Sequence, residues 1–347
     1  MASVQAPPVV VVGASAGGVE ALREFVSNLP ADFPACVLVV LHLPARGSSA
    51  LPAILDRACP LRVQAASEGD RLEPGLVLVG VPDHHMVVLS ESISLTRGPH
   101  ENGHRPAIDV LFRSAARHHG GRVSAVVLSG ALDDGAAGAI AVQRRGGNLI
   151  VQDFDDALYD AMPRAAAAAA EVEHVVPAAK IAQLLGELVA SSPEPSASSA
   201  GELMTRETEL ADMDADELHD PDRPGAPAGL GCPSCGGALF QIEEGNLIRF
   251  RCRVGHAWSP ESLLEQQTLE LEGALWMAIR GLEEKVALVS ELGQRAAERG
   301  YERTASRFTE TADGARQAAE LVRRLVTSLG AGESALSDVE ESTTDGG

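Results

Sequence analysis

Short runs of aliphatic residues alternate, in the first half of the chain, with stretches in which apolar residues recur every three or four positions. The strand-like runs lie at residues 8–12, 36–41, 76–80, 86–89, 124–129, 149–152 and 174–176. Helical spacing lies at residues 19–29, 108–118, 165–170 and 180–189. This alternation is typical of strand–helix units on a mostly parallel sheet. We therefore predict an α/β domain with a doubly wound, mostly parallel sheet over residues 1–190, in which residues 81–85 join two strands as a pair.

The pattern changes twice in the middle of the chain. Residues 191–229 are rich in Ser, Pro, Ala, Asp and Glu and have no sustained apolar period, which predicts an acidic, flexible, solvated linker. Residues 230–258 contain three cysteines and a histidine between glycine-rich turns. They predict a small compact module that differs in kind from the α/β domain.

The last part of the chain shows two apolar stripes with steps of three and four residues, separated near Gly300. They predict an antiparallel helical hairpin over residues 259–330. Ser259 and Pro260 have the residue types expected at the N-cap and in the first turn of its first helix. The glycine- and acid-rich residues 331–347 are expected to form a disordered tail.

The charge of the chain limits its partners. The 347 residues carry a formal net charge of −21, and the acidic excess is concentrated in residues 191–229 and 331–347. Binding of nucleic acid or of an anionic membrane surface requires clustered Lys and Arg, so both are excluded as direct partners. No apolar run approaches the roughly 20 residues of a membrane span, and no cationic segment precedes an apolar stretch at the N-terminus. We therefore expect a cytoplasmic protein.

Three of the strand-like runs end at residue types that acyl-transfer chemistry needs. The first leads into Gly13-Ala14-Ser15-Ala16-Gly17-Gly18, the second into His42, and a third into a glycine-rich turn with Asp133 and Asp134. The carboxyl ends of parallel strands lie on the same side of a sheet, where ligands bind. We therefore expect a serine, a histidine and an aspartate to meet at one edge.

Each of these residues also has a simpler interpretation. The Gly-x-Ser-x-Gly turn is typical of a nucleophile elbow, whose backbone N–H groups at a helix start can stabilise an oxyanion, but it also fits a phosphate-binding turn of a nucleotide-binding regulator. His42 could serve as a general base or bond only to local backbone. Asp134 could orient that base or cap the next helix, and Asp133 is a rival for either role.

Several motifs in the same order resemble the catalytic domain of the CheB family of chemotaxis protein-glutamate methylesterases, over about residues 8–188. They are the serine turn, the strand that ends in His42, Asp83-His84-His85-Met86, His104-Arg105-Pro106-Ala107-Ile108-Asp109-Val110-Leu111-Phe112, Asp134-Gly135-Ala136-Ala137-Gly138 and Met162-Pro163-Arg164. Family members commonly carry Thr where this chain has Ala16, and Met-Gly where it has Ala131 and Leu132. Such changes leave the backbone N–H groups in place.

The resemblance implies a serine hydrolase that acts on glutamate γ-methyl esters of chemoreceptors, with glutamine deamidation as a related activity. Ser15 would be the nucleophile, His42 the general base and Asp134 its orienting acid, while Ala16, Gly17 and Ala131 would line the oxyanion or substrate site. No cofactor is implied for catalysis, and the partner would be a methylated chemoreceptor or a similar helical signalling protein. The chain starts its first strand at residue 8 and is expected to lack the receiver domain of typical members. The alternative is a signalling scaffold without turnover.

The cysteine module has the spacing Cys232-x2-Cys235-x16-Cys252-x3-His256. Two knuckle-like pairs with three thiolates and one imidazole are typical of a tetrahedral zinc site, and four protein ligands favour a structural over a catalytic role. The alternative is a set of unrelated or redox-active cysteines. We predict a structural zinc ion in a module that resembles a zinc ribbon.

Overall fold

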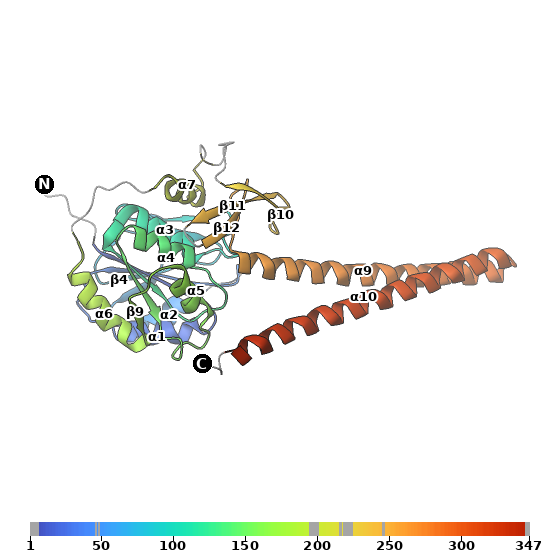
Figure 1. Cartoon of the computed structure of the whole chain (residues 1–347), viewed down its shortest axis with the longest axis horizontal. Helices are drawn as coiled ribbons and strands as arrows, with labels where there is room; N and C mark the ends of the chain where they lie inside the picture. Colours follow the sequence, from blue (N-terminus) through green and yellow to red (C-terminus); the bar gives the residue numbers. More distant parts are fainter. Residues whose placement is uncertain are drawn as a thin grey trace. The chain divides into compact units, whose positions relative to one another are not determined.

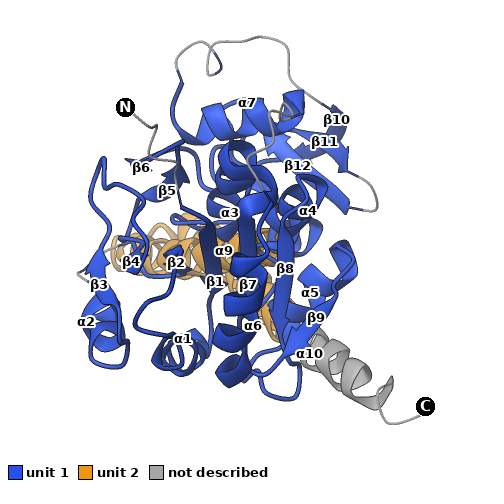
Figure 2. Cartoon of the chain, turned by 90° about the vertical axis from the view of Figure 1, so that its left-hand side faces the viewer, with its two compact units in different colours: residues 1–264 blue, residues 265–347 orange. Residues whose placement is uncertain are grey.

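The computed structural model describes residues 7–45, 47, 49–193, 201–214, 217, 225–244 and 247–343. The chain divides into two compact units, residues 1–264 and 265–347 (Figure 2). The first unit contains all the strands of the described residues, and the second contains most of a pair of long helices (Figure 1).

A seven-stranded sheet forms the centre of the first unit, and every pairing in it is parallel. Its strands, in spatial order, are β3 (Arg62–Ala65), β4 (Leu76–Val79), β2 (Cys36–Leu41), β1 (Val9–Ala14), β7 (Val123–Val127), β8 (Asn148–Gln152) and β9 (His174–Val176). The two central strands β1 and β2 are fully buried and almost entirely aliphatic. This burial on both faces explains why they read as continuous apolar runs in the sequence.

Helices cover both faces of this sheet. One face packs against α1 (Gly18–Ser27), α2 (Leu51–Asp56) and α6 (Ala178–Ala190), and the other against α3 (Ile108–His119), α4 (Ala136–Arg144) and α5 (Ala161–Ala169). Alternate residues of β1 serve the two cores, because successive strand side chains point to opposite faces. Val9 and Val11 belong to one cluster, and Val10 and Val12 to the other. The predicted doubly wound α/β fold is confirmed.

The expected pairing of residues 76–80 with 86–89 is wrong. Strand β4 already has β2 and β3 as parallel neighbours, so β5 (His85–Val88) instead forms an antiparallel hairpin with β6 (Ile93–Thr96). Three elements, β3, β6 and α2 (Leu51–Asp56), were not predicted from the sequence. These elements are short, and the two strands carry polar residues between the apolar ones, so neither stands out as an aliphatic run.

The segment expected to be a solvated linker contains helix α7 (Glu202–Ala211). Its Glu207 is buried and forms ion pairs with Arg249 and Arg251, more than 40 residues further along the chain. Helix α7 packs against α3. A polar segment is solvated only when its charged side chains have no buried partners. The partners of Glu207 are distant in the sequence, so composition alone could not predict its burial.

A second, antiparallel sheet contains β10 (Ala226–Gly231), β11 (Ala238–Glu244), β12 (Leu247–Cys252) and β13 (Ala257–Trp258), in that order. Its small core consists of Cys232, Leu239, Cys252, Trp258 and Leu263. The predicted cysteine module is therefore a four-stranded sheet.

The predicted helical hairpin is present as α9 (Pro260–Glu298) and α10 (Glu302–Thr343), separated by a turn at Gly300. Contacts of Glu283 with Arg323 and of Ser290 with Arg316 show the antiparallel pairing. Helix α10 continues to Thr343, whereas disorder was expected from residue 331. The Ala, Glu and Leu residues of this stretch favour helix. Residues 344–347 lie outside the described part.

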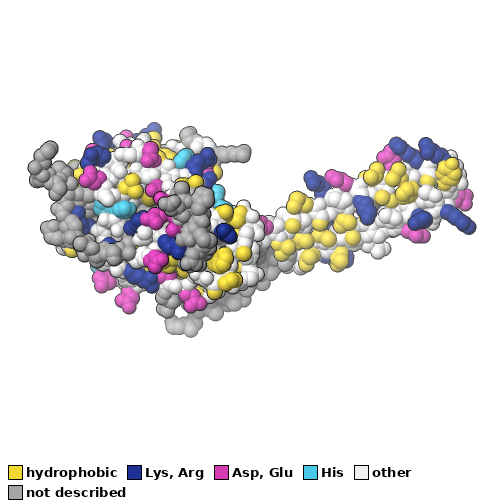
Figure 3. Space-filling model, turned by 90° about the horizontal axis from the view of Figure 1, so that it is seen from above, with side chains coloured by type: hydrophobic (Ala, Val, Ile, Leu, Met, Phe, Trp, Pro, Cys, Tyr) yellow, Lys and Arg dark blue, Asp and Glu magenta, His cyan; other side chains and the backbone are white. Residues whose placement is uncertain are grey.

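Many large apolar side chains of the hairpin are exposed, and Figure 3 shows hydrophobic side chains gathered along it. Trp276, for example, is 53% exposed. The helices of the described residues include none with the length and apolar character needed to cross a membrane.

Substitution of Gly13 tests the packing of β1 against α3. A Cβ atom on Gly13 would lie 2.3 Å from Cγ2 of the buried Ile108, at the start of α3. We expect Gly13→Ala to lower the free energy of unfolding by about 1–3 kcal/mol, the usual cost of overpacking a core, as measured by urea denaturation. Gly186→Ala is the matched control, because a Cβ there meets nothing within 4 Å in α6; it should be neutral or stabilising. Equal midpoints for Gly13→Ala and the wild type would contradict this account.

Candidate active site

Ser15, His42 and Asp134 meet at the carboxyl edge of the parallel sheet. Ser15 follows β1, His42 follows β2, and Asp134 lies in the loop between β7 and α4. Because β1 lies between β2 and β7 in the sheet, the three loops are neighbours. His42 Nδ1 lies 3.1 Å from Ser15 Oγ, and His42 Nε2 lies 2.7 Å from Asp134 Oδ2. The structure thus joins a hydroxyl, an imidazole and a carboxylate in one chain of hydrogen bonds.

The turn that carries Ser15 is tight. The Ser15 N–H donates to Ser129 O at 2.9 Å, the Gly18 N–H donates to Ser15 O at 2.9 Å, and α1 begins at Gly18. Gly17 has a φ of 69°, and a Cβ there would lie 2.7 Å from Ser129 Oγ, so this position requires glycine. The turn places Ser15 at the positive end of α1.

Three backbone N–H groups, in the Ser15 turn and in the loop after Ser129, have no hydrogen-bond acceptor within the described residues. They belong to Ala16, Gly17 and Ala131. Ala131 lies two residues beyond Ser129, whose carbonyl binds the Ser15 N–H. Such unpaired donors near a nucleophile are what an oxyanion site requires.

The carboxylate of Asp134 is 2% exposed and held on both oxygens. Oδ2 accepts from the Ile108 N–H at 2.7 Å, and Oδ1 accepts from the Asp109 N–H at 3.2 Å, both at the start of α3. Oδ1 also accepts from Asn102 Nδ2 at 3.1 Å. Burial alone would raise the pKa of Asp134, but the hydrogen bond and charge of His42 hold it well below its usual value. Asp134 is therefore ionised and can stabilise a protonated His42.

The carboxyl group of Asp109 stabilises the loop that carries Asp134. Its Oδ1 accepts from the Gly135 N–H at 3.1 Å and the Gly138 N–H at 2.6 Å, and it is buried. Burial and the neighbouring charge of Asp134 raise the pKa of Asp109. Asp109 thus caps α4 and fixes the turn around Asp134.

His104 lies against His42. The two rings stack with centroids 3.6 Å apart and an interplanar angle of 13°. Burial and the charge of His42 lower the pKa of His104 to about 4, so its ring is neutral near pH 7 and adds no second positive charge. Arg105, from the same motif, donates through Nε to Asp83 Oδ1 at 2.9 Å and therefore has a structural contact away from His42.

The rivalry between Asp133 and Asp134 is decided by geometry. Asp133 accepts a hydrogen bond from Ser259 Oγ at 2.7 Å, whereas Asp134 contacts His42. Burial raises the pKa of Asp133 to about 7. The contacts of Asn102 and Ser259 with these acids were not predicted from the sequence. Asn102-Gly103 is a turn signal, but nothing in the sequence links it to Asp134.

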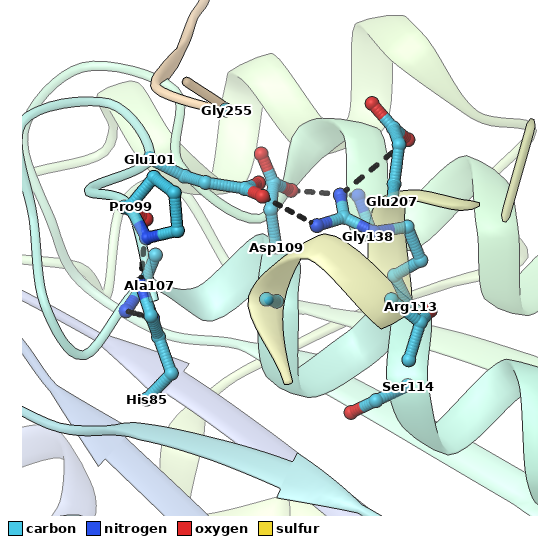
Figure 4. A network of polar contacts seen from close by, with 12 residues as sticks. His85, Pro99, Glu101, Ala107, Asp109, Arg113, Ser114, Gly138, Glu207 and Gly255 are labelled. Carbon is cyan, nitrogen blue, oxygen red and sulfur yellow. Dashed lines mark hydrogen bonds and ion pairs between the residues drawn. The ribbon is translucent and has the colours of Figure 1, made fainter. Parts of the chain in front are cut away.

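A buried ion network joins α3, α7 and β12. Arg113 contacts Glu101 at 2.7 Å and Glu207 at 3.8 Å (Figure 4). Arg251 contacts Glu101 at 3.0 Å and Glu207 at 2.9 Å, and Arg249 binds both carboxylate oxygens of Glu207. All five side chains are buried. Loss of either glutamate would leave buried arginine charges without a partner, so the network attaches the second sheet to the α/β domain.

The structure brings the four predicted metal ligands together. One ligand atom from each of Cys232, Cys235, Cys252 and His256 lies within 4.8 Å of all the others. Cys235 Sγ and Cys252 Sγ are 3.7 Å apart, and His256 Nδ1 lies 3.8 Å from Cys232 Sγ and 3.6 Å from Cys252 Sγ. In a tetrahedral site with zinc–sulfur distances of about 2.3 Å, two sulfurs lie about 3.8 Å apart. The donor set and its spacing fit a metal of this kind.

The α/β domain is similar in sequence to proteins of a known family. Residues 10–185 match the family model of the CheB methylesterase. Protein-glutamate methylesterase/protein-glutamine glutaminase 2 of Methanosarcina mazei is 36% identical over 189 residues, which cover 52% of this chain and 52% of that protein. The protein of the same name from Methanosarcina acetivorans is 40% identical over 163 residues, 45% of this chain and 46% of its own length.

A solved structure agrees with this match. The crystal structure of the Thermotoga maritima CheB methylesterase catalytic domain aligns with a TM-score of 0.51 and 32% sequence identity, over 52% of this chain and 98% of that one. This chain spans about half the length of the curated relatives it matches. The family model covers half of the chain, in the part that carries Ser15, His42 and Asp134, and the chain belongs to the CheB methylesterase family.

Proposed function

We propose that this protein is a serine hydrolase that removes methyl groups from glutamate γ-methyl esters of a signalling protein. The observation that supports it most directly is the hydrogen-bonded chain from Ser15 Oγ through His42 to Asp134. A phosphate-binding turn needs neither the histidine nor the acid. The three residues are the proposed catalytic residues.

The proposed reaction has two steps. Ser15 Oγ attacks the ester carbonyl carbon, and His42 Nδ1 takes the hydroxyl proton and returns it to the methoxy group, which leaves as methanol. Water then attacks the acyl-enzyme, His42 takes its proton and returns it to Ser15 Oγ, and the glutamate carboxylate is released. Asp134 stabilises the protonated imidazole. The N–H groups of Ala16, Gly17 and Ala131 are the proposed donors to the tetrahedral oxyanion.

The proposed substrate is a methylated chemoreceptor or a similar helical signalling protein, met in the cytoplasm. The names of the relatives, which pair methylesterase with protein-glutamine glutaminase, support both the ester substrate and a related deamidation of glutamine. Both reactions pass through the same acyl-enzyme with a different leaving group. The proposed chemistry needs no cofactor.

Removal of the Ser15 hydroxyl tests this proposal. The assay follows methanol release from a synthetic helical peptide that carries a glutamate γ-methyl ester. We expect Ser15→Ala to lower kcat by at least about 1,000-fold, because the nucleophile is lost while the fold is not. Ser27→Ala is the matched control, since that hydroxyl donates to Glu24 O and accepts from Asn28 Nδ2 on the exposed side of α1, with no contact to His42 or Asp134. Equal release by wild type and Ser15→Ala would contradict a serine hydrolase and favour a scaffold.

We also propose that the cysteine module holds one structural zinc ion through Cys232, Cys235, Cys252 and His256. The inter-ligand distances support a tetrahedral site, and four protein ligands leave no open position for substrate. The Trp258 indole N–H donates to Cys232 Sγ at 3.4 Å, as expected for a group that supports a thiolate ligand. The ion would supply folding free energy to a sheet with a very small apolar core.

Metal analysis tests this site. We expect about one zinc per purified chain, lost in Cys252→Ser together with the near-ultraviolet circular dichroism of the buried Trp258, because ligation and folding of the module are coupled. Cys59→Ser is the matched control, because Cys59 packs beside the main sheet away from the cluster. A metal-free wild type with the same Trp258 signal would contradict the proposal.

A further inference from the structure

All the donors and acceptors of the Asn102 side chain form hydrogen bonds, next to the candidate site. Its Nδ2 donates to Asp134 Oδ1 and to Asp109 Oδ2, each at 3.1 Å. Its Oδ1 accepts from the Ser259 N–H at 2.9 Å and from Ser262 Oγ at 3.2 Å. An amide offers two donors and two acceptor lone pairs, and here all four are satisfied in a buried position.

These contacts fix which end of the amide faces Asp134. A flipped amide would place its oxygen against the ionised Asp134 carboxylate and its NH₂ against the Ser259 N–H. Both contacts would be repulsive, and buried polar groups would be left unpaired. Ser259 and Ser262, at the start of α9, therefore determine that a donor points at Asp134.

The backbone of the Asn102 loop is also held by the segment just before α9. The Asn102 N–H donates to Ala257 O at 2.8 Å, and the Ala257 N–H donates to His100 O at 3.2 Å. The ring of Trp258 lies over Gly103. Since His104 of the same loop stacks on His42, residues 257–262 support the imidazole and the carboxylate together.

We propose that Asn102 is a positioning residue for Asp134, and that Ser262 and the Ser259 backbone set the direction of its amide, so that the segment after the cysteine module is a required part of the esterase site. This inference rests on the proposed function for its kinetic consequence. Its structural consequence, the stability of the His42–Asp134 hydrogen bond, can be measured without turnover. The C-terminal segment thus contributes to the reaction without touching the substrate.

The first measurement uses the inactive Ser15→Ala protein. Proton nuclear magnetic resonance follows the low-field signal of the His42 Nε2 proton shared with Asp134. We expect Asn102→Asp and Ser262→Ala, each added to Ser15→Ala, to lose this signal to exchange with water or to move it upfield, because Asp134 loses a donor or the donor loses its fixed direction. Ser262→Thr, which keeps the hydroxyl, should restore the signal.

The second measurement uses kinetics with the methyl-ester peptide. We expect Ser262→Ala to lower kcat about tenfold or more with little change in KM, as for a lost hydrogen bond that supports a charged group, and Ser262→Thr to recover most of it. Ser124→Ala is the matched control. Ser124, in β7, is about as buried as Ser262, and its hydroxyl accepts a hydrogen bond from the Asn148 side chain in β8, away from Asp134. The Ser124→Ala variant should keep the wild-type kcat.

The outcomes separate the two proposals. An unchanged low-field signal in both Asn102→Asp and Ser262→Ala overturns the positioning role, whatever the activity. A fall in kcat that Ser262→Thr does not recover, with equal loss of zinc and thermal stability, also overturns it, since it marks a general structural effect. A wild type that releases no methanol yet shows the expected signal changes leaves the positioning of Asp134 supported and the proposed esterase overturned.

Discussion

The buried negative charge of Asp134 is the constraint on which the arrangement of the site depends. An ionised carboxylate in a dry environment is stable only when it is paired and fully hydrogen-bonded. Asp134 receives donors from His42, from the first residues of α3 and from Asn102. These donors come from three parts of the chain. The position of this one carboxylate therefore constrains the end of β2, the start of α3 and the loop before it.

The α/β domain could be predicted from the sequence because its information is local. Strands buried on both faces appear as aliphatic runs, and in a parallel sheet the run that ends in His42 must deliver it to the same edge as the loops after β1 and β7. The sequence alone therefore predicted that the serine, the histidine and the aspartate lie at one edge of the sheet. The spacing of the cysteines and the histidine in residues 232–256 likewise predicted that the four side chains would meet at one tetrahedral metal site.

The remaining contacts could not be predicted, because they join residues that are far apart and of ordinary type. Glu207 looks like one more acid in a polar segment until Arg249 and Arg251 are placed beside it. Asn102 and Ser262 are separated by 160 residues, and no local pattern connects them. Short strands such as β3, with mixed polar and apolar residues, gain their stability from neighbours rather than from their own sequence.

The orientation of the His42 ring has a consequence for the order of events at the serine. Nε2 is occupied by Asp134, and the stacked ring of His104 blocks one face of the imidazole. Nδ1 is then the nitrogen that accepts and donates each proton in the proposed cycle. In that cycle, the leaving methanol and the attacking water both occupy the position next to Nδ1. Methanol must therefore leave before His42 can activate the water.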